Sequence, residues 1–151
     1  MTRADILNAM KQRFTAITTG SGYNYTVSKC GLFDVIPTPK STNLFISIID
    51  KGQTFVQANY GASNPEDLTL DVDVICRIRV SGTGQETNYT LAPAKMVADI
   101  RRAIGTDDTW GGKAFITNYV GDTTEIQFGD TVIVQSTISL EIQFRVSKWS
   151  N

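Results

Sequence analysis

The most telling absence in the sequence is histidine, of which there is none. Histidine is the commonest general base in enzymes and the commonest ligand of transition metals, so a serine triad in its usual form and a cysteine–histidine dyad are excluded. Two cysteines without histidine also cannot build a structural zinc site. We therefore expect no catalytic residue, no cofactor and no bound metal, and we expect that the protein is not an enzyme.

Cysteines and long apolar runs are also scarce. Only Cys30 and Cys76 are present, and Cys76 lies among alternating apolar residues, where a thiol behaves as a small hydrophobe. This usage is typical of a reducing compartment. The longest apolar runs, such as residues 44–49, are far shorter than the roughly 20 residues that a membrane span needs. The N-terminus lacks the basic start and apolar stretch of a signal peptide, so we expect no membrane segment.

Excess charge of either sign is absent too. The formal net charge is −1, so bulk electrostatic attraction to DNA is not expected. The hydrophobic content of 41% is typical of a folded chain rather than a disordered one. No repeat or internal linker is visible, and we predict a single domain over residues 1–151.

Two long stretches of alternating apolar and polar residues are the strongest pattern present, residues 68–80 and 132–146. Such period-2 patterning predicts strands with one buried face. At about 3.3 Å per residue, unbroken strands would extend roughly 40 to 50 Å, whereas a domain of this size has a radius of gyration near 15 Å. Unbroken strands would project beyond their own core and require a partner. Alternatively, each stretch contains a bulge or bend and forms two ordinary strands.

Two helices are predicted from apolar residues spaced three and four apart. Residues 3–18 have such a stripe, with Thr2 placed as the N-cap. Residues 91–104 have a second stripe, with Pro93 expected in the first turn and Gly105 as a C-terminal cap.

The remaining chain predicts shorter strands and two loops. The strands are expected at residues 23–27, 44–49, 54–60 and 114–120, with turns at Lys51–Gly52 and Gly121–Asp122. Irregular connections are expected at residues 28–42 and 81–90. The simplest way to bury these surfaces is an α+β fold, an antiparallel sheet with long strands and two helices packed on one face.

Three weaker chemical patterns were weighed. The segment 105–113 ends in Gly-Lys but has Asp107 where a phosphate loop needs its first glycine, and Ala114 where it needs Ser or Thr. Asp107, Asp108 and Asp122 could gather around a cation, although acidic residues are common in exposed turns. Trp110 and Trp149 could stack on nucleic-acid bases, but few basic residues lie near them, so core or interface aromatics are favoured.

The polar face of the first long strand separates its charges, with Asp71 and Asp73 in one half and Arg77 and Arg79 in the other. Copies packed side by side could set acid against base and gain register. A ring formed by head-to-tail contacts would use such an arrangement. We therefore take these four residues as a hypothetical subunit interface; the alternative is an ordinary solvated face.

Three features of the chain occur together: the Ala4-Asp5-Ile6-Leu7 helix running into Gly22-Tyr23, the Val97–Ile104 helix followed by Trp110, and the long alternating strand near the C-terminus. In this layout the chain resembles the small tail-terminator and neck (tail-completion) proteins of tailed bacteriophages.

The resemblance implies a structural virion protein of the tail or neck, assembled in the host cytoplasm. Such a subunit forms a homo-oligomeric ring, commonly a hexamer, at the head-proximal end of the tail tube. The ring ends tube polymerisation and joins the tail to the head connector, and DNA passes through its channel without specific binding. The alternatives are another neck, head-completion or tail tube protein, or a small-ligand or nucleic-acid binding module.

On this interpretation the second long strand has two roles. We expect its apolar face to pack under the helices and its polar face to meet the lumen or a neighbouring subunit. The apolar set is Val134, Ile138, Leu140, Ile142 and Phe144, and the polar set is Gln135, Thr137, Ser139, Glu141, Gln143 and Arg145. The loops 28–42 and 81–90 are candidates for contact with tube or connector.

Overall fold

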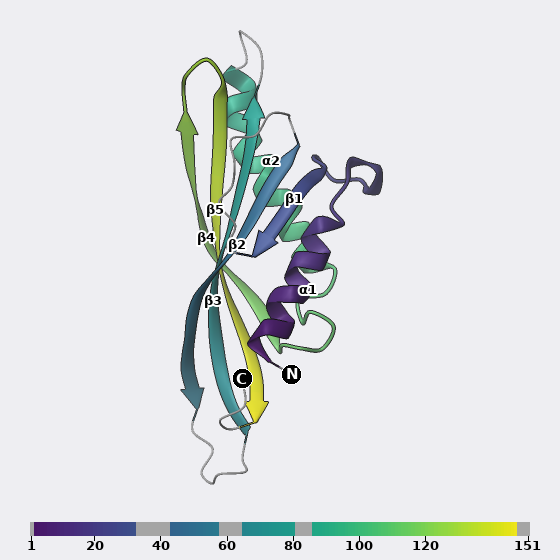
Figure 1. The fold of residues 1–151 in the computed structure, drawn as a ribbon, viewed down its shortest axis with the longest axis vertical. Helices are drawn as coiled ribbons and strands as arrows, with labels where there is room; N and C mark the ends of the chain where they lie inside the picture. Colours follow the sequence, from purple (N-terminus) through teal and green to yellow (C-terminus); the bar gives the residue numbers. More distant parts are fainter. Residues whose placement is uncertain (1, 33–42, 58–64, 81–85, 148–151) are drawn as a thin grey trace.

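The computed structural model describes residues 2–32, 43–57, 65–80 and 86–147. The chain forms an elongated α+β structure (Figure 1). Its elements are α1 (Arg3–Thr15), a 3₁₀ turn (Thr19–Ser21), β1 (Val27–Leu32), β2 (Leu44–Gln57), β3 (Pro65–Val80), α2 (Glu86–Gly105), β4 (Ile116–Gln127) and β5 (Val132–Ser147).

The strands form one five-stranded sheet in the order β1-β2-β3-β5-β4. Four of the strands, β2 to β5, pair antiparallel, as predicted. The prediction of a purely antiparallel sheet is wrong, because β1 runs parallel to β2. A parallel neighbour needs a long connection, and the chain between Leu32 and Leu44 is long enough to provide one. The sheet is therefore mixed.

The two long strands are unbroken. β3 and β5 pair residue by residue from Pro65 opposite Ser147 to Val80 opposite Val132, with no register shift. At about 3.3 Å per residue each strand is roughly 50 Å long. The alternative in which each stretch hides a bulge is wrong for this pair.

Both helices lie on one side of the sheet (Figure 1), as predicted. Their buried residues form a single core with the apolar faces of β2, β3 and β5. The five β5 residues predicted to lie under the helices, residues 134, 138, 140, 142 and 144, are all buried. Alternation along the strands thus identified the core face correctly.

Helix α1 begins as predicted and ends early. Thr2 forms a capping box with Asp5, in which each side chain accepts a hydrogen bond from the other residue's backbone N–H. The helix ends at Thr15 rather than at residue 18. Ile17 extended the apolar spacing because it is buried in the same core from the segment after the helix.

Helix α2 is longer than predicted, beginning at Glu86 instead of residue 91. Pro93 consequently lies inside the helix and not in its first turn. A proline there removes one backbone hydrogen bond, but Ala92 and Met96 beside it are buried, and this packing holds the helix together. Residues 86–90 of the predicted connection are therefore helical, and residues 81–85 lie outside the described residues.

Two predicted turns are β-bulges instead. The Lys51–Gly52 turn is an irregularity within a continuous β2, where Gly52 has φ of +105°. The Gly121–Asp122 turn is a bulge at Val120 within β4, which continues to Gln127. Glycine with a polar neighbour marks both kinds of feature, so the local sequence did not separate them.

The predicted strand at residues 23–27 is wrong except for its last residue, because β1 occupies residues 27–32 and so covers the first part of the predicted loop 28–42. The reason is a side chain of α2. The carboxylate of Asp99 accepts hydrogen bonds from the backbone N–H groups of Asn24 and Tyr25, at 2.9 and 3.0 Å, so these amides bond to a side chain and not to a strand. Residues 33–42 lie outside the described residues.

Candidate assembly surface

The face of the sheet opposite the helices, here called the open face, contains all ten residues that the sequence singled out. Four come from β3 and six from β5, and each is half-buried or exposed. The register makes the two sets direct neighbours: Asp71 lies opposite Glu141, Asp73 opposite Ser139, and Arg77 opposite Gln135. Two sets predicted separately thus form one surface.

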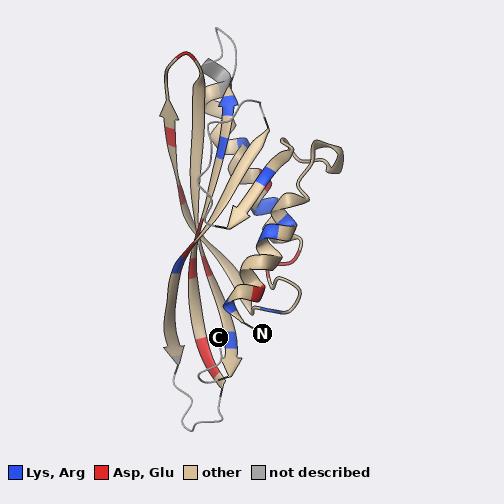
Figure 2. Cartoon of the chain, viewed as in Figure 1, with Lys and Arg blue, Asp and Glu red and all other residues tan. Residues whose placement is uncertain are grey.

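The charges of β3 on the open face are separated: its basic residues lie toward the C-terminal end of the strand and its acidic residues toward the N-terminal end (Figure 2). Arg77 is held within the subunit, because its Nε and Nη2 atoms donate to Oε1 of Gln135 at 3.1 and 2.5 Å. This contact fixes the direction of the guanidinium along the surface.

The acidic residues are only partly neutralised. Asp73 accepts a hydrogen bond from the hydroxyl of Ser139 at 2.9 Å and pairs with the ammonium group of Lys51 at 3.5 Å. Asp71 and Glu141 lie directly opposite each other, and neither carboxylate makes a hydrogen bond or ion pair within the described part of the chain. Like charges in this position repel each other and destabilise the pair of strands.

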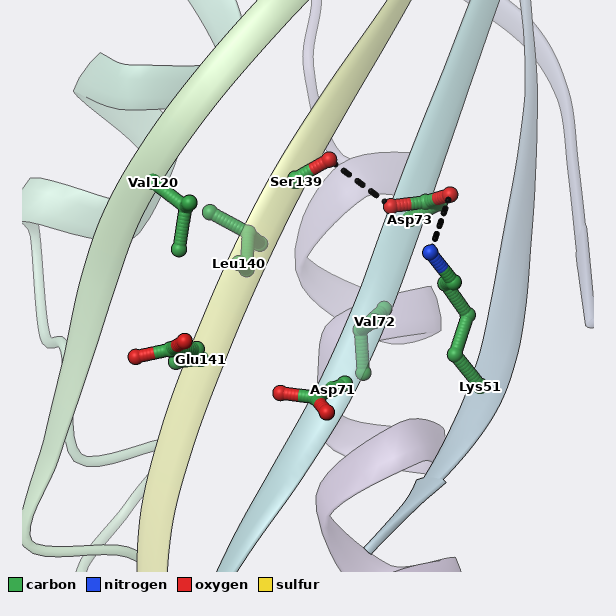
Figure 3. A pocket seen from close by; sticks show the side chains of 8 residues that line it. All are labelled: Lys51, Asp71, Val72, Asp73, Val120, Ser139, Leu140 and Glu141. Atoms are coloured by element: carbon green, nitrogen blue, oxygen red, sulfur yellow. Dashed lines mark hydrogen bonds and ion pairs between the residues drawn. The ribbon is translucent and has the colours of Figure 1, made fainter.

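These carboxylates border a shallow cavity of about 260 Å³ on the open face (Figure 3). Figure 3 shows the Asp73 carboxylate between Ser139 and Lys51. Asp71 and Glu141 lie two residues further along the same two strands. The cavity is lined by Lys51, Asp71, Val72, Asp73, Val120, Ser139, Leu140 and Glu141.

At the end of the open face, Arg145 binds Asp67 through two parallel hydrogen bonds, at 2.6 and 2.9 Å. This bidentate contact lowers the pKa of Asp67 and raises the pKa of Arg145. The guanidinium also lies 5.2 Å from the ring centroid of Phe115. One of the six predicted β5 residues is thus tied to a carboxylate and an aromatic ring of its own subunit.

The aspartates weighed as a cation site are not brought together. Asp107 accepts hydrogen bonds from Thr109 and from the backbone of Gly111, which, with nearby Arg13, lower its pKa to about 2. Asp122 belongs to β4 and accepts a hydrogen bond from the hydroxyl of Tyr119. Among residues 2–32, 43–57, 65–80 and 86–147, no group of three His, Cys, Asp or Glu side chains is arranged to hold a metal ion.

Trp110 is a core residue and not a stacking platform. Its ring is 1% exposed, packs edge-on against Phe14 at 5.9 Å, and lies under the guanidinium of Arg13 at 4.4 Å. The indole N–H donates to Oγ1 of Thr117 at 2.7 Å. Trp149 lies outside the described residues.

Sequence reasoning missed one contact on the open face and a set of exposed apolar side chains along the sides of the sheet. Lys51 was assigned to a turn, although it lies on β2 and binds Asp73. Several apolar side chains on the outer strands are exposed, among them Phe55 and Val56 on β2 and Ile116 and Val120 on β4. Neither β2 nor β4 alternates regularly between apolar and polar residues around these positions. This irregular pattern was the feature of the sequence from which the exposed side chains could have been predicted.

Within the described ranges, no helix combines the length and the apolar character that crossing a membrane requires.

Comparisons with known proteins place few constraints on this surface. No protein-family profile matches the chain, and no curated protein matches it. Among solved structures, the chain is similar to the sheath/tube terminator, in its extended state, of PVC, an extracellular contractile injection system studied by cryo-EM. The sequences are 9% identical and the TM-score is 0.43. The comparison covers 99% of this chain and 59% of the terminator chain, so this chain spans about three fifths of that neighbour's length.

Proposed function

We propose that this chain is a structural subunit of a phage tail, a terminator that assembles into a hexameric ring at the head-proximal end of the tail tube. The ring ends tube polymerisation and provides the surface to which the head connector binds. The proposal takes its identity from the resemblance in sequence layout. Its main structural support is the unbroken pairing of β3 with β5 over 16 residues, with only one of the two faces covered by the helices.

The open face is proposed to line the lumen or to meet the next component of the tail. β3 is an interior strand between β2 and β5, so its charged residues can reach a partner only through the face of the sheet. Asp71, Asp73, Arg77 and Arg79 would then contact a partner stacked on this face, or DNA passing across it. Because acids and bases are mixed there and the chain carries a net charge of −1, DNA can pass without specific binding.

No catalytic step is proposed. The polar groups of the open face engage one another, as Arg77 does with Gln135 and Asp73 does with Ser139, which is suited to a fixed surface rather than to proton transfer.

The test is a capping assay with the tube subunit encoded in the same genome. Tubes are assembled alone or with this protein and examined by electron microscopy. We expect a single ring at one end of each tube and arrested growth from that end. An unchanged distribution of tube lengths with bare ends would contradict the proposal, and long tubes formed by this chain alone would identify it as a tube subunit instead.

Charge reversal tests the role of the open face. Replacing Arg77 and Arg79 by Glu is expected to weaken assembly without unfolding the subunit, because both side chains lie on the open face, outside the hydrophobic core. Light scattering that shows the same oligomer before and after the change would remove these residues from the interface.

A further inference from the structure

Apart from β1, which pairs only with β2 and forms one end of the sheet, two stretches of strand edge have no further described strand beside them. One is β4, which pairs only with β5. The other is the second half of β2, because the register between β1 and β2 ends at Ile48, and residues 49–57 pair only with β3. Both edges present backbone N–H and C=O groups to which a further strand can bond.

Edge strand β4 has few of the features that protect such an edge. Its sequence, ITNYVGDTTEIQ, contains no lysine, arginine or proline, and it has one bulge, at Val120. Ile116 and Val120 are 40% and 57% exposed. A long exposed edge with apolar side chains favours pairing with another strand.

Exposed apolar side chains lie at the same level of the sheet on both edges, on β2 and at the start of β4. Phe55 and Val56 on β2 are 55% and 53% exposed, and Phe115, directly before β4, is 53% exposed. The level is set by a row of paired residues that crosses the whole sheet next to these side chains: Thr54, Thr69, Gln143 and Ile116.

The strand directions at the two edges are complementary. β2 is antiparallel to β3, β3 to β5, and β5 to β4, so β4 runs opposite to β2. In a ring whose copies are related by rotation, every copy points the same way, and the two edges meet antiparallel at equal height. If the strands tilt relative to the ring axis, the paired residues shift along the strands, but the pairing stays antiparallel.

We propose that residues 49–54 of β2 in one copy pair antiparallel with residues 116–121 of β4 in the next copy, which the registers place at the same level, so that the sheet continues across each subunit junction. The occupant of each edge is a second copy of this chain. This inference rests on the proposed function, which supplies the ring, and it identifies the two strands that join neighbouring subunits in that ring.

A two-fold junction of β4 with β4 is the competing geometry, and charge disfavours it. The only charged residues of β4 are Asp122 and Glu125, so a two-fold junction sets acid against acid. The free half of β2 instead carries one charge of each sign, Asp50 and Lys51, which pair within the subunit with Arg3 and Asp73. Head-to-tail pairing therefore avoids placing two acidic strands side by side.

Disulfide cross-linking tests the junction. A variant with Thr54→Cys and Ile116→Cys, oxidised after assembly, is expected to give a ladder of covalent multimers that ends at the ring. Each single variant is expected to remain monomeric on a denaturing gel, and the native Cys30 and Cys76 do not compete because they are buried. Covalent dimers from Ile116→Cys alone would establish two-fold pairing and overturn the proposal, as would rings visible by microscopy that give no ladder.

A second variant tests the junction without oxidation. Val56→Lys with Ile116→Lys is expected to lower the assembled fraction by about tenfold or more, because each junction then buries ammonium groups among apolar side chains. The matched control, Asn8→Lys with Gln12→Lys, adds the same charges on the exposed side of α1 and should assemble normally. Equal melting temperatures show that both variants fold.

The outcomes separate the two proposals. If the edge variant caps tubes as the unmodified protein does, the proposed junction is wrong and the terminator role stands. If the unmodified protein fails to cap tubes, the terminator role itself is wrong.

Discussion

The two faces of one sheet differ in how their side chains are satisfied. The face under α1 and α2 is apolar and almost fully buried, and its one polar β5 residue, Ser136, has no hydrogen-bond partner for its hydroxyl in the part of the chain that the structure describes. The open face is polar and half-exposed, and most of its charges bond to neighbours on adjacent strands. Folding therefore depends mainly on one face, and the other is the face that the proposed function assigns to a partner or to the lumen.

This division has an energetic consequence. Burying apolar surface contributes about 25 cal/mol per Å², whereas exposed ion pairs contribute about 0 to 1 kcal/mol each. Substitutions on the two faces should accordingly differ in size, even when they lie at adjacent positions of one strand.

The sharpest contrast is between Phe144 and its neighbour Gln143. Phe144 is fully buried under the helices, and Phe144→Ala is expected to lower the free energy of unfolding by about 3 to 5 kcal/mol. Gln143→Ala, on the open face, is expected to change it by less than about 0.5 kcal/mol. Chemical denaturation of both variants measures the difference. Similar losses at the two positions would show that the faces are not energetically distinct.

A smaller effect is expected on the covered side at Asp99, which is 2% exposed. Its carboxylate accepts three hydrogen bonds, from the backbone N–H and side-chain amide of Asn24 and from the backbone N–H of Tyr25. Asp99→Ala leaves these donors without their acceptor and should cost about 1 to 3 kcal/mol. Amide hydrogen exchange at Asn24 and Tyr25 should accelerate in the variant. Asp108→Ala is the control, and unchanged exchange would refute the anchoring role.

These two cases also show what the sequence could and could not predict. Alternation in β5 located Phe144 on the core face, because side-chain direction in a strand depends only on local period. The Asp99 anchor joins residues far apart in the sequence, so local patterns could not reveal it, and the strand at residues 23–27 was predicted wrongly.

The surface residues divide in the same way. All ten predicted residues lie on the open face, since their alternation fixed their side of the sheet. The contact between Lys51 and Asp73 depends on the register of β2 against β3 after a bulge, and no local signal encodes that register.

Replacing serine by alanine should change the free energy of unfolding in opposite directions on the two faces. Ser136 is fully buried with an unsatisfied hydroxyl, so Ser136→Ala should stabilise the fold by about 1 kcal/mol. Ser139 donates a hydrogen bond to Asp73, so Ser139→Ala should destabilise it by about 0.5 to 1.5 kcal/mol. Paired denaturation curves provide the measurement. A loss of stability in Ser136→Ala would mean that its hydroxyl has a partner in the folded protein.

The smallest expected effect concerns repulsion on the open face. Asp71 and Glu141 lie opposite each other on adjacent strands, so Asp71→Asn should stabilise the isolated subunit by about 0.2 to 1 kcal/mol. Added salt should reduce this gain, because exposed charges are screened over about 10 Å at 0.1 M ionic strength. The control Asp67→Asn should have the opposite sign, because Asp67 binds Arg145. If Asp71→Asn weakens ring assembly while it stabilises the isolated subunit, a cationic group of a partner lies beside Asp71 in the ring and offsets its repulsion with Glu141. If assembly is unaffected, the acidic residues of the open face lie toward solvent or the lumen.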